Sequence, residues 1–212
     1  MDELIFYERK LWNLGYEKVM GIDEAGRGAL SGPLVVAGVV FDKDNIVEDS
    51  RDSKLLSPKV RETVYFEILR KAKKISISVI PHFIIDKINI YNATLLGAKQ
   101  LVLKIVPDYL LIDAFFIKDV SIPQVKLVKG EIKSISIAAA SIVAKVTRDN
   151  VMKKLHKFYP EYRWDKNKGY PTEAHIQAIL RNGISSFHRR SYSPCKIQFL
   201  LEENRRKELY SF

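Results

Sequence analysis

The sequence predicts an α/β protein, in which a mixed β-sheet flanked by helices is followed by a helical C-terminal part. Short apolar runs bounded by polar residues alternate with longer amphipathic stretches between Val19 and Val128. Beyond Val128 the chain shows helical patterns and many basic residues. Strands that alternate with helices are typical of an α/β sheet, and the helices that follow indicate a helical extension.

The first predicted elements have distinct local signals. Apolar residues at helical spacing indicate a helix within residues 2–15, and a short apolar run indicates a strand at 19–23. The valine-rich run at 34–41 is typical of a strand buried on both faces. Ser57 and Pro58 have the residue types of an N-cap and a first helical position, so we expect a helix from there to residue 73.

The later elements follow from the same kinds of signal. Serine alternates with aliphatic residues at 75–80, which predicts a strand. An amphipathic stretch over 92–106 ends before Pro107, as helices do before proline. The other expected elements are strands at 109–113 and 125–128 and helices at 134–158, 171–180 and near 200–209.

Length and composition fit a single soluble domain over residues 1–212, in which residues 160–212 form a basic, mainly helical part. No apolar run approaches the ~20 residues that a membrane helix needs. The N-terminus carries early acids where a signal peptide has a basic start. The single cysteine, Cys195, excludes an internal disulfide and fits a reducing compartment. We therefore expect a cytoplasmic protein that does not bind membranes.

The net charge of +10 is concentrated in the last third of the chain. From Lys145 to Phe212 there are 15 Lys and Arg against 7 Asp and Glu, which leaves +8. A basic region of this kind suits a nucleic-acid phosphate backbone. A merely solvated basic surface is the alternative, and charge alone does not separate the two.

Residues 21–34 contain the most informative pattern. Asp23 and Glu24 end a short apolar run and are followed by Gly26, Arg27 and Gly28. Burying an unpaired carboxylate costs several kcal/mol, and a hard divalent cation such as Mg²⁺ or Mn²⁺ relieves that cost. Glycine lets the backbone approach a ligand closely. The alternative is that the two acids are solvated turn residues.

Two further acids follow predicted strands. Asp113 ends the apolar run 110–112, and Glu131 comes soon after the strand at 125–128. If these strands are neighbours, the four acids meet at one edge of the sheet, where they repel each other. Two divalent ions about 4 Å apart would relieve this repulsion and support in-line hydrolysis of a phosphodiester. Alternatively, Asp113 is an ordinary strand-end acid, and Glu131 stabilises the N-terminus of the next helix.

Ordered motifs over nearly the whole chain resemble the ribonuclease HII family. They lie at residues 21–33, 52–57, 112–114, 129–130, 138–149 and 168–172. The resemblance implies a ribonuclease H-like fold and four acids that bind Mg²⁺ or Mn²⁺. It also implies cleavage of RNA in RNA–DNA hybrids and cleavage 5′ to single ribonucleotides embedded in duplex DNA, leaving 3′-OH and 5′-phosphate ends. Asp23, Glu24 and Asp113 match three of the acids, whereas Glu131 stands where the family usually has Asp.

The resemblance also assigns substrate contacts. It implies that Gly26, Arg27 and Gly28 sense the ribonucleotide 2′-OH through backbone groups, that Tyr170 packs on the following sugar, and that Lys54 faces a phosphate. The structural alternatives are a tight turn for residues 26–28, a partly buried tyrosine at a helix start for Tyr170 and a surface lysine for Lys54.

Two groups outside these motifs have structural alternatives. His188, Arg189 and Arg190 either hold phosphates or form a solvated basic loop. Arg148 and Asp149 are interpreted as a structural pair.

Two other functions compete with a ribonuclease HII-like endonuclease that acts as a monomer. A ribonuclease HIII-like enzyme would carry Gly-Thr-Gly in place of residues 26–28 and an extra N-terminal domain. A non-catalytic nucleic-acid-binding protein of the same fold would not need the full set of acids that is present here.

Overall fold

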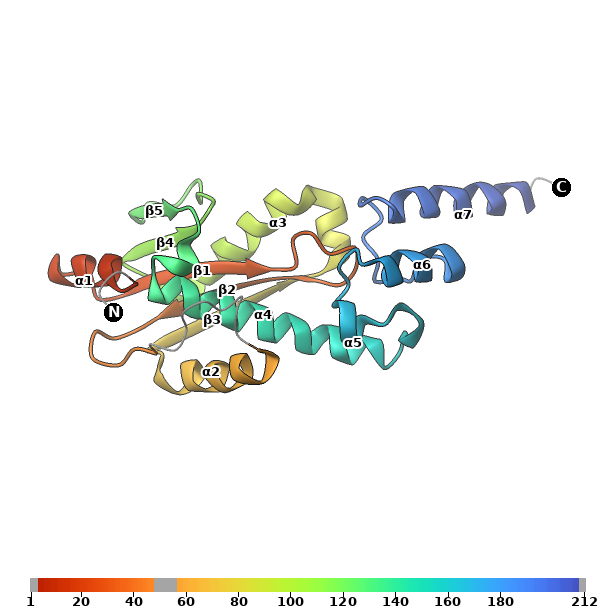
Figure 1. Ribbon diagram of the computed structural model, residues 1–212. Coiled ribbons are helices and arrows are strands. Elements are labelled where there is room, and N and C mark those ends of the chain that lie inside the picture. The colour runs from red at the N-terminus through yellow and green to blue at the C-terminus, as the bar shows by residue number, and fades with distance from the viewer. Residues whose placement is uncertain (1–3, 48–56, 210–212) are drawn as a thin grey trace. The chain divides into compact units, whose positions relative to one another are not determined.

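The computed structural model describes residues 4–47 and 57–209 (Figure 1). It divides into two compact units, which are described separately below. Unit 1 consists of Met1–Ala25, Val35–Val79 and Thr94–Thr147, and unit 2 consists of Gly26–Leu34, Ile80–Ala93 and Arg148–Phe212. A single functional domain over 1–212 stays a prediction.

Five strands form one mixed sheet with the order β3-β2-β1-β4-β5. Their bounds are β1 Val19–Ala25, β2 Leu34–Val40, β3 Lys74–Ile80, β4 Tyr109–Asp113 and β5 Gln124–Leu127. The central strand β1 pairs antiparallel with β2 and parallel with β4, and β5 is parallel to β4. This arrangement confirms the predicted mixed sheet, and every predicted strand is found within two residues of its expected bounds.

The longer helices are α1 Phe6–Asn13, α2 Pro58–Lys71, α3 His82–Ile105, α4 Ile135–His156, α6 Glu173–Asn182 and α7 Cys195–Leu209. Shorter helices are η2 Gly130–Ile132, η3 Pro160–Tyr162 and α5 Trp164–Asn167, which the sequence patterns did not predict. The Ser57 side chain accepts a hydrogen bond from the Val60 N–H at 3.3 Å, which confirms the predicted cap of α2. None of the helices in the described residues is both long and apolar enough to span a membrane.

Helix α3 begins ten residues before its predicted start at Asn92. The backbone breaks inside the helix at Asn89, whose φ is 63° and ψ is 168°. The Asn89 side chain then accepts a hydrogen bond from the Asn92 N–H at 3.0 Å, so the second half begins with its own cap. The amphipathic pattern therefore predicted only the second half of α3, because the break at Asn89 interrupts the helical pattern before it.

In unit 1 the helices α2 and α4 pack on one face of the sheet (Figure 1). Val35, Ala37 and Val39 of β2 share one buried cluster with Ala139 and Val143 of α4. The backbone of α4 occupies the space that a Cβ atom on Gly21 of β1 would need. The small residues of α4 therefore permit close packing on the sheet.

A buried carboxylate from α1 fixes the start of α4. Glu8 accepts hydrogen bonds from the Ser134 hydroxyl at 2.5 Å and the Ser136 N–H at 3.0 Å, and Ser134 Oγ accepts from the Ile137 N–H at 3.2 Å. Burial raises the pKa of Glu8. A negative charge at this place also interacts favourably with the helix dipole. The start of α4 is thus capped by the adjacent Ser134 and also by Glu8, which is far away in sequence.

Unit 2 has its own aromatic core. Tyr162 and Trp164 stack with ring centroids 5.2 Å apart, and His188 lies against Tyr162 at 4.7 Å. Met152 of α4 and Ile179 of α6 complete this buried cluster. The core draws on α4, η3, α5, α6 and the segment after α6, so unit 2 has a packed interior of its own.

Candidate active site

Asp23 and Asp113 lie at corresponding positions on two neighbouring parallel strands. Ile22 of β1 pairs with Ile112 of β4, so the next residue on each strand is one of these acids. Asp113 is the last residue of β4 and Asp23 lies two residues before the end of β1, so both acids are near the C-terminal ends of their strands, where sites in sheets of this kind gather. Asp23 is 8% exposed, and its Oδ1 accepts a hydrogen bond from the Glu24 N–H at 2.7 Å.

Glu131 follows directly on a residue that is bonded to Asp113. The Gly130 N–H donates to Asp113 Oδ1 at 2.8 Å. Lys129 has a left-handed φ of 55° and leads into η2, whose second residue is the buried Glu131. The acid that caps the N-terminus of α4 is Glu8. Glu131 is thus the sequence neighbour of Gly130, which contacts Asp113.

The three acids of the strands interact electrostatically. The pKa of Asp23 is raised well above its usual value, first by burial and then by repulsion from Glu24 and Asp113. Hydrogen bonds from the Glu24 N–H and the Ser141 hydroxyl oppose this rise. Asp23, Glu24 and Asp113 are therefore within electrostatic reach of one another, and their role together with Glu131 as the site stays a prediction.

Ser141 was missed as a site residue. The sequence showed it only as one small residue among the alanines that bring α4 close to the sheet. Its signal was that it carries a hydroxyl on a buried helix face, where a polar group needs a partner. The structure provides that partner in Asp23.

The donor set fits a hard divalent cation in its chemistry. Carboxylate oxygens are the ligands that Mg²⁺ and Mn²⁺ prefer, and a cation would offset the burial and repulsion that raise the pKa of Asp23. Among residues 4–47 and 57–209, however, no group of three or more His, Cys, Asp or Glu side chains is arranged to hold a metal ion as it stands. Asp23, Glu24 and Asp113 thus interact electrostatically, but within the described residues they are not arranged as a complete metal-binding site.

Unit 2 contains the predicted substrate-sensing glycines. Gly26 is buried with a φ of 99°, whereas Arg27 and Gly28 are exposed. A Cβ atom on Gly28 would meet no described atom of the protein within 4 Å, and its φ is not left-handed. Neither backbone conformation nor packing within the described chain requires glycine at that position, whereas close approach of a ligand would.

Tyr170 also lies in unit 2. Its ring lies under the Arg148 guanidinium at 5.0 Å from the ring centroid, and the side chain is partly exposed. A partly exposed ring held on one side by a cation is suited to packing against a sugar. The predicted phosphate contact of Lys54 lies outside the described residues.

The sequence-based interpretations of His188 and Arg189 are wrong. Both side chains are buried, with 1% and 0% of their surface exposed, so they neither form a solvated loop nor reach a phosphate. Arg190 is exposed, and its N–H donates to Asp86 at 2.9 Å.

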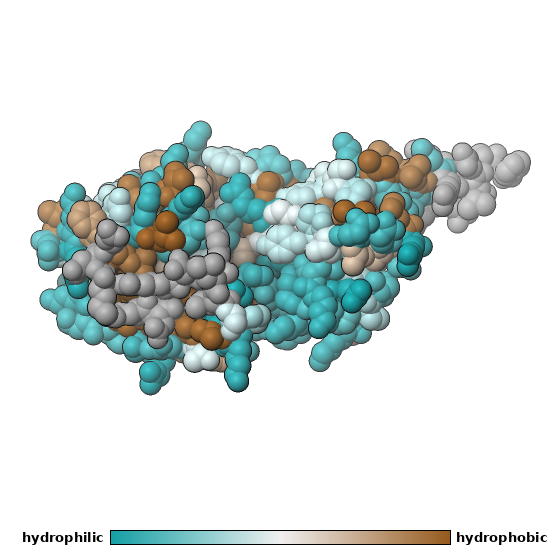
Figure 2. All heavy atoms as spheres, viewed as in Figure 1, coloured by the Kyte–Doolittle hydropathy of each residue, from teal (hydrophilic) through white to brown (hydrophobic). Residues whose placement is uncertain are grey.

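Exposed basic side chains occur elsewhere in unit 2. Figure 2 shows hydrophilic surface over the second half of α4 and over α5. The exposed basic residues in this part of the chain are Lys153, Lys154, Lys157, Arg163 and Lys166, and we call them the basic patch. The patch is one solvent-exposed part of the predicted basic region.

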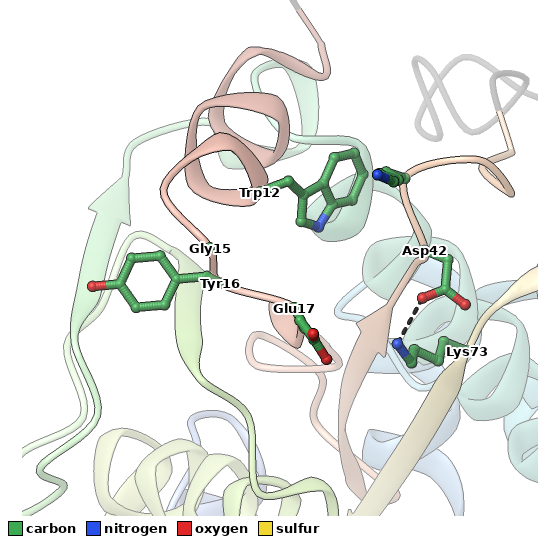
Figure 3. A pocket seen from close by; sticks show the side chains of 7 residues that line it. Trp12, Gly15, Tyr16, Glu17, Asp42 and Lys73 are labelled. Carbon is green, nitrogen blue, oxygen red and sulfur yellow. Dashed lines mark ion pairs between the residues drawn. The ribbon is translucent and has the colours of Figure 1, made fainter.

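Unit 1 also has a cavity of about 390 Å³ away from the acids (Figure 3). It is lined by Trp12, Gly15, Tyr16, Glu17, Asp42, Lys43 and Lys73. An ion pair of 2.7 Å joins Lys73 and Asp42 along one wall. Glu17 precedes β1 and Asp42 follows the antiparallel β2, so the cavity lies at the end of the sheet opposite to Asp23.

Comparison with known proteins gives concordant matches. A family model described as Ribonuclease HII matches residues 20–195. A protein named Ribonuclease HII from Ligilactobacillus salivarius is 46% identical over 191 residues, which cover 89% of this chain and 74% of that protein. Another of the same name from Caldicellulosiruptor saccharolyticus is 44% identical over 195 residues, covering 91% of this chain and 95% of that protein. The crystal structure of the ribonuclease H2 from Pyrococcus horikoshii matches with a TM-score of 0.72 at 28% identity, covering 90% of this chain and 99% of that one.

Proposed function

The chain belongs to the ribonuclease HII family and is a metal-dependent ribonuclease H, and from that premise we propose its substrates and mechanism. It hydrolyses the RNA strand of RNA–DNA hybrids and cuts 5′ to ribonucleotides embedded in duplex DNA, leaving 3′-OH and 5′-phosphate ends. It acts as a monomer in the cytoplasm. The observation that carries the proposal is the pairing of β1 with β4, which sets Asp23 beside Asp113.

Asp23, Glu24, Asp113 and Glu131 are the residues that would hold divalent metal. Two Mg²⁺ or Mn²⁺ ions, when bound, supply an activated water and stabilise the charge on the departing 3′ oxygen. Asp23 contributes a buried carboxylate whose orientation is fixed by the Glu24 N–H and the Ser141 hydroxyl. The Gly130 N–H holds Asp113 in place through its Oδ1.

Gly26, Arg27 and Gly28 recognise the ribonucleotide, and Tyr170 packs on the following sugar. The open space around Gly28 supports this role, because a backbone that must touch a 2′-OH leaves no room for a side chain. The 2′-OH distinguishes RNA from DNA at a given position. Residues 26–28 read Gly-Arg-Gly, which favours ribonuclease HII over the HIII-like alternative.

The basic patch contributes affinity for the phosphate backbone. Phosphate contacts orient a protein on a duplex but carry no information on the sugar. The patch therefore supports binding to hybrid and to pure DNA alike, whereas the choice of cleavage position belongs to residues 26–28.

The test is cleavage of a duplex DNA that carries one ribonucleotide. We expect cutting 5′ to that ribonucleotide with Mg²⁺ or Mn²⁺, and no cutting with chelator or of the all-DNA duplex. A long RNA–DNA hybrid run in parallel tests the second substrate. Binding without metal-dependent cleavage of either substrate would leave only the non-catalytic alternative.

A further inference from the structure

Residues 26–33, which we call the sensor loop, contain the glycines proposed to read the 2′-OH. The Arg27 carbonyl is the acceptor for two side chains of unit 2. Arg189 Nη1 donates to it at 2.9 Å, and the Tyr192 hydroxyl donates to it at 2.8 Å. The Arg189 guanidinium also lies over the Tyr192 ring at 5.1 Å, so the two donors hold each other in place.

The carbonyls that follow in the sensor loop are held in the same way. Arg189 Nε and Nη2 both donate to the Gly32 carbonyl, at 3.2 and 3.1 Å. Arg148 Nη2 donates to the Ser31 carbonyl at 3.1 Å, and Arg148 Nε donates to the Pro33 carbonyl at 3.0 Å. Four carbonyls of this one loop are thus bound by the guanidinium groups of two buried arginines.

Arg148 links the sensor loop to the region of Tyr170. Its Nη1 donates to the Lys168 carbonyl at 2.9 Å, and its guanidinium lies over the Tyr170 ring. Burial lowers the pKa of Arg148 to about 10, so the group is still charged at neutral pH. A buried charge is costly unless its donors are satisfied, and here the carbonyls satisfy them.

Because the peptide bond is planar, the hydrogen bonds to the Arg27 carbonyl also restrict the direction of the Gly28 N–H. In a trans peptide the C=O and the next N–H point opposite ways. Because the Arg27 carbonyl faces Arg189 and Tyr192, the Gly28 N–H points away from both of them. Gly28 is exposed and a Cβ atom built on it meets open space, so a ligand can approach this peptide closely.

We propose that Arg189 and Tyr192 are positioning residues for ribonucleotide recognition, which fix the Arg27–Gly28 peptide so that the Gly28 N–H faces the 2′-OH. Arg148 fixes the far end of the same loop and the Tyr170 ring. The proposal rests on the proposed role of Gly26, Arg27 and Gly28. It adds residues that touch no substrate and act through the backbone of the sensor loop.

The Tyr192→Phe variant tests the proposal with the loss of one hydroxyl, since it keeps the ring under Arg189. Tyr162→Phe is the matched control, because its hydroxyl donates to the Gly183 carbonyl at 3.1 Å, outside the sensor loop. Arg189→Lys is the stronger change, since lysine lacks the planar fork that reaches two carbonyls. All are made in a cleavage-deficient Asp113→Asn chain with Mg²⁺ present.

The measurement is the ratio of two dissociation constants, one for an all-DNA duplex and one for the same duplex with a single ribonucleotide. We expect Tyr192→Phe to lower this preference about fivefold, the value of one hydrogen bond, and Arg189→Lys to lower it about tenfold or more. Affinity for the all-DNA duplex should stay unchanged, as should the preference of the control. General destabilisation would reduce both affinities together, so the ratio separates positioning from folding.

The outcomes are distinguishable. If the Asp113→Asn chain itself shows no ribonucleotide preference, the proposed role of residues 26–28 fails. If it shows the preference and Tyr192→Phe keeps it in full, the positioning proposal is overturned. An equal loss in Tyr162→Phe also overturns it. Should Arg189→Lys fail to fold by circular dichroism, Tyr192→Phe decides alone.

Discussion

The guanidinium of Arg148 occupies the space that a Cβ atom on Gly26 would need. Gly26 also has a left-handed φ of 99°, a conformation that residues with a Cβ atom rarely adopt. Two independent constraints therefore require glycine at this position, and both come from the protein itself. At Gly28, by contrast, a Cβ atom would meet open space.

Alanine at these two glycines should thus affect different properties, the stability at Gly26 and the cleavage activity at Gly28. Gly26→Ala should lower the free energy of unfolding by about 1–3 kcal/mol, because it adds backbone strain and displaces Arg148. Gly28→Ala should leave the melting temperature unchanged and reduce cleavage at an embedded ribonucleotide. Thermal melts and turnover of both variants check this. A destabilised Gly28→Ala protein would show that its glycine is structural after all.

The Asp113→Asn variant should keep the fold and lose at least about 100-fold in turnover, because it removes a metal-binding charge. Asn retains an oxygen that accepts from the Gly130 N–H, so the local hydrogen bond is preserved. Steady-state rates at saturating Mg²⁺, with a melting curve as control, provide the measurement. Near-normal turnover would remove Asp113 from the site.

Glu131 is the acid that departs from the family pattern. If it is the fourth ligand, Glu131→Asp should keep or raise activity in Mg²⁺ and Glu131→Gln should lower it, because Mg²⁺ demands strict geometry. Mn²⁺, which is less demanding, should narrow the difference between Glu and Asp. Turnover of the three proteins with each metal decides this. Full activity of Glu131→Gln in Mg²⁺ would mean that only three acids are needed.

Binding to duplexes should weaken steeply with salt, because neutralised phosphates release counterions. Alanine at Lys153 and Lys154 of the basic patch should weaken binding to hybrid and to pure DNA equally, with a slope of log Kd against log salt reduced by about 1–2. Lys104→Ala, an exposed lysine of α3 in unit 1, is the control and should change neither quantity. A slope that is independent of these lysines would argue against the patch.

Two buried histidines should make stability depend on pH. Trp164 Nε1 donates to His175 Nε2 at 3.1 Å, so His175 donates through Nδ1 to the Tyr170 carbonyl at 2.9 Å. His188 Nε2 then donates to the same His175 Nε2 at 3.2 Å, so Trp164 and His188 share this one acceptor, and His188 Nδ1 accepts from the Ser185 N–H at 2.9 Å. Both rings accept hydrogen bonds as neutral imidazoles, and protonation of either ring removes an acceptor that these bonds need.

The sign follows from the lowered pKa values. Burial, and then His175, lower the pKa of His188 from 6.5 to about 3, and burial lowers that of His175. The unfolded chain therefore binds the proton first, so this stability is complete above about pH 6.5 and is lost as the pH falls toward about 3. His188→Gln should reduce the slope of unfolding free energy in this range by about 1.4 kcal/mol per pH unit. Denaturant titrations of both proteins between pH 7.5 and 4.5 measure it, and identical slopes would contradict the neutral pair.

The sequence by itself determined the strands and the acids that lie at or near their ends. β4 spans Tyr109–Asp113 as predicted, because an apolar run that stops at a carboxylate is a local signal. The cap of α2 at Ser57 was equally local. The activity was equally readable from the chain, because residues 21–33 carry a motif of the ribonuclease HII family in one continuous segment.

Only the tertiary structure decided which polar residues are buried. Arg189 stands in a basic run whose local pattern is that of a surface loop, yet its donors go to carbonyls of residues 27 and 32. Ser141 has the size of a packing residue, and its bond to Asp23 depends on how α4 lies on β1. The burial of a charge and the choice of its partner are set by contacts between distant segments, and local periodicity carries no information about such contacts.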